Sequence, residues 1–85
     1  MASYRLLFKK SVARDLRKLP GKDLVAILKR IDALAEDPRA RGCKKLAGAD
    51  YYRVRLRSYR IIYEIRDSEL VVQVVRVAHR SSAYS

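Results

Sequence analysis

Three segments with the pattern of β-strands follow one another between residues 52 and 77, separated only by short turns. In Tyr52–Leu56 and again in Tyr59–Ile65, apolar side chains occupy every second position, which places them on one face of a strand. The third segment, Leu70–Val77, is almost continuously apolar, which is typical of a strand inside a sheet. Strands joined by such short turns pair antiparallel, so this half of the chain predicts a three-stranded meander.

Two amphipathic helices are predicted ahead of these strands. A short strand over residues 4–8 leads into a helix for which Ser11 is a candidate N-cap. Pro20-Gly21 ends that helix, because proline breaks the helical hydrogen-bond ladder. The second helix ends at Asp37-Pro38, since the residue before a proline disfavours the helical conformation. Its stripe of apolar residues has the spacing of a core-facing surface and consists of Leu24, Ile27, Leu28, Ile31, Leu34 and Ala35.

The predicted order is strand, helix, helix, strand, strand, strand. Residues 38–50 contain a proline, two glycines and two lysines, and they are predicted to form a surface loop. We expect an α+β fold in which the N-terminal strand and the two-helix hairpin pack on a small antiparallel sheet. The length of 85 residues predicts a single domain over residues 1–85.

The chain is strongly basic, with 20 lysines and arginines, nine acidic residues and a net charge of +11. The second part, residues 39–85, carries +7 of this charge. A charge of this size predicts an anionic partner, which can be a nucleic acid, a membrane surface or an acidic protein.

Cysteine and histidine each occur once, as Cys43 and His79. An intramolecular disulfide is therefore excluded, which fits a reducing, cytoplasmic location. One cysteine and one histidine make a zinc site improbable, and we expect neither a metal nor a cofactor. The sequence contains no apolar run of about 18 residues, so no membrane span is predicted.

The arginines of the first two meander strands form the clearest candidate site. Period-two alternation places Arg53, Arg55 and Arg57 on one strand face, about 6–7 Å apart, and the tight turn brings Arg60 alongside. Solvent faces of sheets are normally polar, so a merely solvated surface stays open as an alternative. Four arginines within eight residues repel one another, however. Because a guanidinium donates two hydrogen bonds to a phosphate at once, we expect this surface to bind RNA phosphates.

The residues after the last strand can come to lie beside these arginines: His79, Arg80 and Tyr84. Histidine is the side chain best suited to proton transfer near neutral pH, but a structural hydrogen bond at the strand end stays equally open for His79. Tyr84 has the alternative of anchoring the chain end in the core. Lys44 and Lys45, in the predicted loop, complete the candidate phosphate-binding set.

Several segments resemble the RelE/ParE toxin superfamily. The run YRVRLRSYRIIY at residues 52–63 is similar to the central motif of that family, and VAHRSSAY at residues 77–84 is similar to its C-terminal motif. The segments KKSVARDLRKLP at residues 9–20 and DPRARGCKKLAG at residues 37–48 match as well. Each motif is weakly specific by itself, but their order and spacing extend the resemblance over essentially the whole chain.

The resemblance implies a RelE-like fold and a toxin of a type II toxin–antitoxin system. RelE-type toxins enter the ribosomal A site and cut mRNA without a metal, by attack of a 2′-hydroxyl on the adjacent phosphate. The implied partners are mRNA, the ribosome and an acidic, RelB-like antitoxin that forms a hetero-oligomer with the toxin.

Position by position, the resemblance implies roles for individual residues. It puts Arg60 at the phosphate-binding arginine, Arg80 at the C-terminal catalytic arginine and Tyr84 at the tyrosine that stacks on a base.

Two positions depart from the best-known member of the family. Arg53 and Arg55 stand where that member has lysines. Arginine does not release its proton in proteins, so we expect Arg53 and Arg55 to hold the phosphate. The hypothesis for the proton transfers is then that His79 or Tyr84 shares them.

Other functions remain open. The chain can be a ParE-like inhibitor of DNA gyrase, a non-catalytic nucleic-acid-binding module or an inactive toxin. ParE-like relatives usually lack the basic residues together with the C-terminal tyrosine, so Arg60, Arg80 and Tyr84 favour the RelE-like branch.

Overall fold

The computed structural model describes residues 3–46 and 50–79. Arg80 and Tyr84 therefore lie outside the described residues. The elements follow the predicted order, with one additional short strand. They are β1 (Arg5–Phe8), α1 (Lys10–Arg17), α2 (Gly21–Glu36), β2 (Cys43–Lys45), β3 (Tyr51–Leu56), β4 (Tyr59–Arg66), the 3₁₀ turn η1 (Asp67–Glu69) and β5 (Val71–His79).

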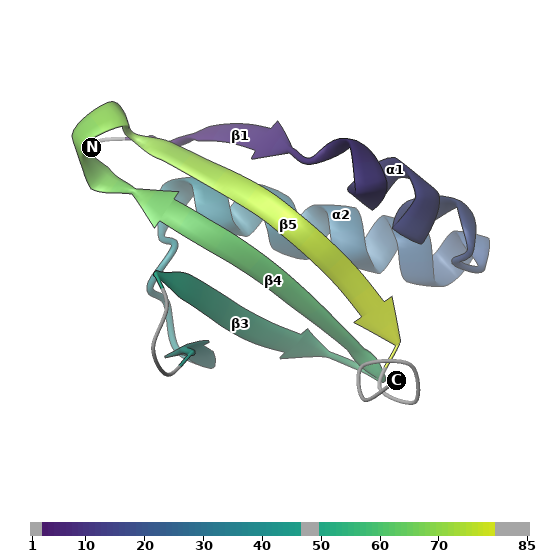
Figure 1. The fold of residues 1–85 in the computed structure, drawn as a ribbon. Coiled ribbons are helices and arrows are strands. Elements are labelled where there is room, and N and C mark those ends of the chain that lie inside the picture. Colours follow the sequence, from purple (N-terminus) through teal and green to yellow (C-terminus); the bar gives the residue numbers. More distant parts are fainter. Residues whose placement is uncertain (1–2, 47–49, 80–85) are drawn as a thin grey trace.

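The strands form a mixed sheet in the order β1-β5-β4-β3-β2 (Figure 1). The meander of β3, β4 and β5 pairs antiparallel, as predicted. β1 pairs in parallel with the first half of β5, so the sheet is not wholly antiparallel. The α+β fold class with helices beside a small sheet is confirmed.

Two local predictions are wrong. Part of the predicted loop over residues 38–50 is strand β2, which pairs antiparallel with β3; three residues are too few to show an alternating pattern. Ser11 lies inside α1, because the helix begins at Lys10 and Lys9 occupies the N-cap position.

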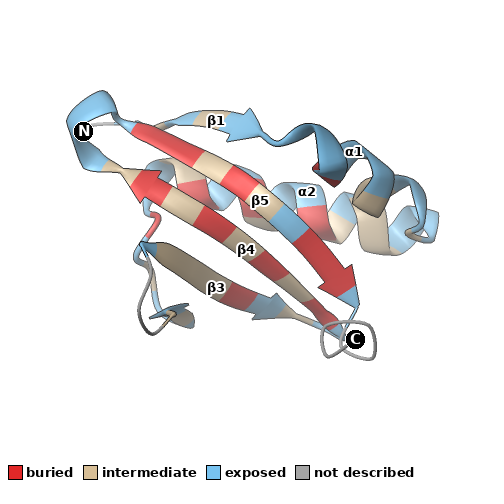
Figure 2. Ribbon diagram, in the orientation of Figure 1, coloured by how far each residue is buried: buried red, intermediate tan, exposed pale blue. Residues whose placement is uncertain are grey.

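The hydrophobic core lies between the helices and one face of the sheet (Figure 2). The core stripe of α2 is narrower than predicted, since Leu28 is 38% exposed whereas Ile27, Ile31 and Leu34 are buried. In the sheet, Tyr63 is fully buried and its hydroxyl donates a hydrogen bond to the carbonyl oxygen of Pro38 at 2.7 Å. Within the described residues, no helix is both long and apolar enough to cross a membrane.

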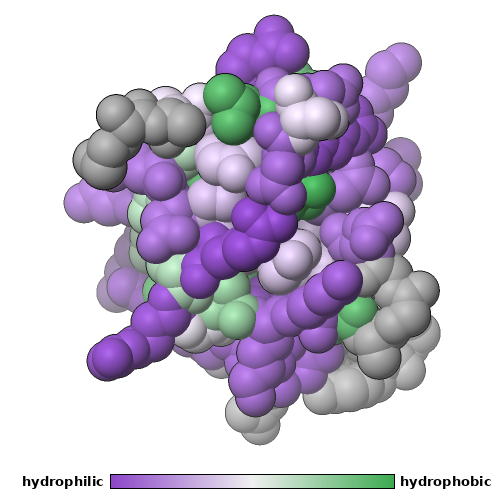
Figure 3. All heavy atoms as spheres, turned by 90° about the vertical axis from the view of Figure 1, so that its left-hand side faces the viewer, coloured by the Kyte–Doolittle hydropathy of each residue, from purple (hydrophilic) through white to green (hydrophobic). Residues whose placement is uncertain are grey.

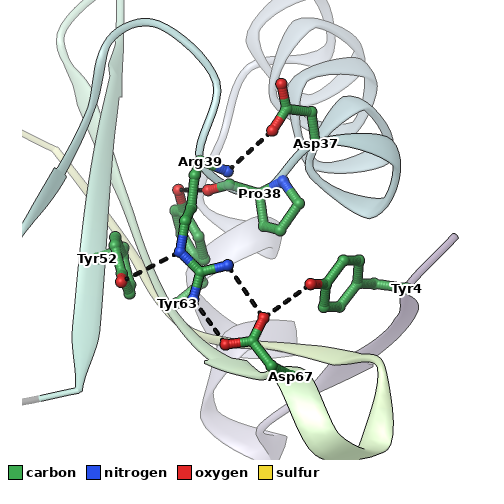
Figure 4. A network of polar contacts seen from close by, with 7 residues as sticks. All are labelled: Tyr4, Asp37, Pro38, Arg39, Tyr52, Tyr63 and Asp67. Carbon is green, nitrogen blue, oxygen red and sulfur yellow. Dashed lines mark hydrogen bonds and ion pairs between the residues drawn. The ribbon is translucent and has the colours of Figure 1, made fainter. Parts of the chain in front are cut away.

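A polar network joins the turn between β4 and β5 to the start of the chain and to the segment after α2 (Figure 4). Asp67 accepts two hydrogen bonds from the guanidinium of Arg39, at 3.0 and 2.7 Å, and one from the hydroxyl of Tyr4 at 2.7 Å. Arg39 also lies over the ring of Tyr52, 5.5 Å from its centroid. Hydrophilic residues cover most of this end of the molecule (Figure 3), so the ion pair is open to screening by salt.

The network makes the stability of the fold sensitive to acid. The hydrogen bonds from Arg39 and Tyr4 lower the pKa of Asp67 from 3.8 to about 2. A carboxylate whose pKa is lower in the folded state stabilises that state above the unfolded pKa, and this contribution disappears as the pH falls through the folded pKa. The contribution of Asp67 is therefore present above about pH 4 and is lost as the pH approaches 2.

We expect Asp67→Asn to lower the thermal midpoint at pH 6 and to make little difference at pH 2. Thermal unfolding followed by circular dichroism at both pH values measures this. Asp32→Asn removes another exposed carboxylate and is the matched control. An equal loss of stability at pH 2 and pH 6 in Asp67→Asn would show that the ionised carboxylate is not what stabilises the turn.

Candidate nucleic-acid interface

The face of the sheet turned away from α2 (Figure 1) is hereafter called the open face, and the strand register places Arg53, Arg55 and Arg60 on it. Partners in an antiparallel ladder point to the same face. Arg55 pairs with Arg60, and Arg53 pairs with Ile62. Lys44 pairs with Arg53 and extends this set onto β2. The open face therefore brings together four of the predicted site residues: Lys44, Arg53, Arg55 and Arg60.

A β-bulge decides which residues of β5 join them. Tyr63 pairs with Val74, but Ile62 pairs with Arg76, so Val75 is an extra residue on β5. One extra residue reverses the facing of every side chain beyond it. The bulge therefore places Arg76 on the open face beside Ile62, and Ala78 beside Arg60.

The resulting surface consists of two rows across the strands. One row runs Lys44, Arg53, Ile62, Arg76, and the neighbouring row runs Arg55, Arg60, Ala78. Adjacent strands lie about 4.8 Å apart, so the basic residues of the two rows lie next to two apolar residues, Ile62 and Ala78. This arrangement can hold a phosphate by charge and a base or ribose by contact.

The single carboxylate that the register places on the open face, among the described residues, lies at its far end. Glu64 is ion-paired with Arg66, which also donates a hydrogen bond to Gln73 at 2.9 Å. Glu64 pairs in the ladder with Tyr51, beyond the two rows. As far as the structure describes the chain, the ladder positions at the arginine end of the open face carry only positive charges, which attract anions.

Arg57 does not belong to this surface, and its predicted position is wrong. It lies in the two-residue loop between β3 and β4 with a φ of 54°. Its guanidinium donates to Asp23 of α2 at 2.7 Å, on the helical side of the sheet. The strand alternation that predicted its facing ends at Leu56, so it does not apply to a loop residue.

Asp23 also receives a hydrogen bond from the hydroxyl of Tyr59, at 2.8 Å. The bonds from Tyr59 and Arg57 lower the pKa of Asp23, and the bond to Asp23 raises the pKa of the Tyr59 hydroxyl. The carboxylate therefore ties the hairpin that carries Arg55 and Arg60 to the first turn of α2.

His79 and Lys45 also face away from the open-face arginines. His79 pairs with Tyr59, and their rings meet edge to face with centroids 5.3 Å apart. Lys45 pairs with Tyr52, on the helical side. Sequence reasoning missed Arg76, although a charged residue within a mostly apolar strand was the available signal.

The open-face groups can bind and polarise a phosphate, but they are poor proton acceptors. Arginine keeps its proton at any accessible pH, and its contribution is to neutralise charge that develops on phosphate oxygens. Within residues 3–46 and 50–79, no three carboxylate, histidine or cysteine groups come together in a way that could hold a metal ion.

Comparison with known proteins identifies the family. A family model described as the ParE toxin of the type II toxin-antitoxin system parDE matches residues 6–84. The mRNA interferase toxin RelE of Escherichia coli K12 is 32% identical, over 98% of this chain and 92% of that protein. Toxin RelG of Mycobacterium tuberculosis is 33% identical, over 95% of each chain.

Solved structures agree with the sequence matches. The RelBE2 toxin–antitoxin complex of Mycobacterium tuberculosis contains a chain that matches with a TM-score of 0.83 and 33% identity, over 92% of this chain and 99% of that one. The RelE–RelB complex of Pyrococcus horikoshii gives a TM-score of 0.84 and 30% identity, over 94% and 98%. The chain therefore belongs to the RelE/ParE superfamily of type II toxins, on its RelE-like branch.

Proposed function

We propose that this toxin is a ribosome-dependent endoribonuclease that cuts mRNA in the A site, and that the open face binds the RNA at the scissile phosphate. The observation that carries the proposal is the direct pairing of Arg55 with Arg60 across two strands. Two arginines directly opposite each other on paired strands concentrate positive charge at one place, and both can donate hydrogen bonds to the same phosphate. The naming of the Escherichia coli relative as an mRNA interferase supports the same activity.

The proposed reaction needs only groups of the RNA and the protein. The ribose 2′-hydroxyl attacks the adjacent phosphorus and loses its proton, while the bond from phosphorus to the 5′-oxygen breaks and that oxygen gains a proton. The products are a 2′,3′-cyclic phosphate and a 5′-hydroxyl. Arg60, assisted by Arg53 and Arg55, holds the phosphate and stabilises the charge that builds up on its oxygens.

The proton transfers fall outside the arginines. His79 and Tyr84 are the groups proposed from the sequence for these transfers. The ring of His79 packs against Tyr59, so a structural role for His79 competes with a role in proton transfer. Arg80 and Tyr84 keep their proposed roles in charge stabilisation and base stacking. The ribosome supplies further acceleration by fixing the in-line geometry of the RNA, an effect that can be worth several kcal/mol.

We infer that the neutralising partner is an acidic antitoxin. The solved relatives include complexes of RelB with RelE from three organisms, and a net charge of +11 favours an acidic counterpart. A small acidic reading frame next to the gene for this chain is the expected genetic arrangement, and co-expression of its product should restore growth.

Expression of the chain in bacterial cells, followed by mapping of mRNA 5′ ends, tests the activity. We expect new ends that keep a fixed phase with the codons of translated messages. The match to the ParE toxin model favours DNA gyrase inhibition as the second candidate function. Intact messages together with a block in DNA supercoiling would support that second function and contradict the first.

A further inference from the structure

A recess with basic side chains borders the open face at the outer edge of β5. β1 covers this edge only as far as Val74, and α1 lies next to the remainder of the strand. A cavity of about 430 Å³ opens there, and its charged or ionisable lining residues are Asp15, Lys18, Tyr59, Arg76 and His79. A volume of this size falls in the range of ligand pockets.

The cavity and the proposed RNA surface share two residues of β5. Arg76 lines the cavity and also lies in the row of Arg53 on the open face, two strands away. Ala78 lines the cavity too, and its ladder partner is Arg60. A strand of RNA whose phosphate sits between Arg55 and Arg60 would therefore reach the cavity by crossing β5, about 5 Å further on.

The charges in the cavity favour an anion. Lys18 at the end of α1 and Arg76 on β5 supply two fixed cations, and each is exposed. Asp15 is the one carboxylate of the lining, and its Oδ2 atom accepts a hydrogen bond from the backbone N–H of Val77 at 3.0 Å. The hydrogen bond joins α1 to β5, so Asp15 has a structural role. This role accounts for the presence of a carboxylate beside two cations that can bind a phosphate.

We propose that this recess is a second phosphodiester subsite, in which Lys18 and Arg76 bind a phosphodiester group beside the position of the one at Arg60. The inference rests on the proposed RNA-cleaving function and adds Lys18 and Arg76 to the residues that determine how the RNA strand is held. The phosphodiester can belong to the cleaved strand or to ribosomal RNA, since the chemistry of the two is the same.

The test measures binding of a single-stranded RNA dodecamer with 2′-O-methyl groups, which block the attack, over a range of salt concentrations. Each phosphate contact contributes a slope of about −0.7 to log affinity against log salt. We expect Lys18→Ala and Arg76→Ala each to flatten the slope by about 0.7. Lys29→Ala removes an exposed lysine of α2 and should leave the slope unchanged.

A variant that changes affinity in the opposite direction makes the test sharper. Asp15→Asn keeps an oxygen for the N–H of Val77 but removes the negative charge from the recess. RNA affinity should therefore increase by about threefold or more. For comparison, the affinity supplied by one phosphate contact changes by about threefold between about 50 and 200 mM salt. Asp32→Asn makes the same change of charge on the exposed face of α2 and should have a smaller effect.

The outcomes separate the two sources of phosphate and the two proposals. Effects of Lys18→Ala and Asp15→Asn on the free dodecamer would assign the subsite to the cleaved strand, whereas effects seen only on ribosome binding would assign it to ribosomal RNA. If both variants behave like their controls in both assays while Arg60→Ala still weakens RNA binding, the subsite is refuted and the proposed function stands. Loss of any Arg60→Ala effect would instead refute the RNA surface itself.

Discussion

Replacing Arg60 with alanine is expected to lower the rate of ribosome-dependent mRNA cleavage by about 10²–10³-fold, the range found when one preorganised donor to a developing anion is removed. Arg60 lies at the centre of the open face, between Arg55 on β3 and Ala78 on β5. The side chain is half-buried rather than fully exposed, so its guanidinium acts in a partly desolvated environment where charge interactions are stronger.

The comparison needs a control for charge and one for folding. Arg14→Ala removes an exposed arginine from α1 and should cleave at the wild-type rate. Circular dichroism and the thermal midpoint should be close to those of the wild type in Arg60→Ala. Cleavage at the wild-type rate in Arg60→Ala would exclude a catalytic role, and a collapsed variant would mean that Arg60 is a structural residue.

Tyr63→Ala should lower the free energy of unfolding by about 3–5 kcal/mol, as expected when a large aromatic side chain is removed from a core. Tyr63 is fully buried on β4, and its ring stacks on Tyr52 with centroids 5.9 Å apart. Since small domains have total stabilities of only about 5–15 kcal/mol, this variant should be partly unfolded at 37 °C.

Tyr63→Phe separates packing from hydrogen bonding at the same position. It keeps the ring but leaves the carbonyl of Pro38 without the hydroxyl that now donates to it, which should cost about 1–2 kcal/mol. Urea unfolding of both variants gives the two values. If phenylalanine proves as damaging as alanine, the hydrogen bond to the segment after α2, and not the packing of the ring, dominates the stability at this site.

Much of the fold followed from local patterns. The apolar stripe of α2 and the alternation in β3 and β4 persist over enough residues for their periods to be recognised, so these elements were predicted correctly. β2 has only three residues, which are too few to show an alternating pattern, and it forms by pairing with β3. Whether such a short edge strand forms therefore depends on contacts with another segment of the chain.

The candidate site was less predictable, because it depends on which face each side chain takes. Without the extra residue Val75, the register of the first half of β5 would continue and would put His79 on the open face and Arg76 on the helical side. The bulge produces the opposite arrangement. The sequence pattern does not reveal this bulge, so it could not fix the facing of His79 or identify Arg76 within a mostly apolar run.

The most direct test of the central claim uses the purified toxin, ribosomes programmed with a defined mRNA and a probe for RNA 5′ ends. We predict cleavage within the codon in the A site, dependent on the ribosome, with a 5′-hydroxyl on the downstream fragment and a 2′,3′-cyclic phosphate on the upstream one. An mRNA that stays intact on the ribosome, with the same preparation inhibiting DNA supercoiling by gyrase, would contradict the claim.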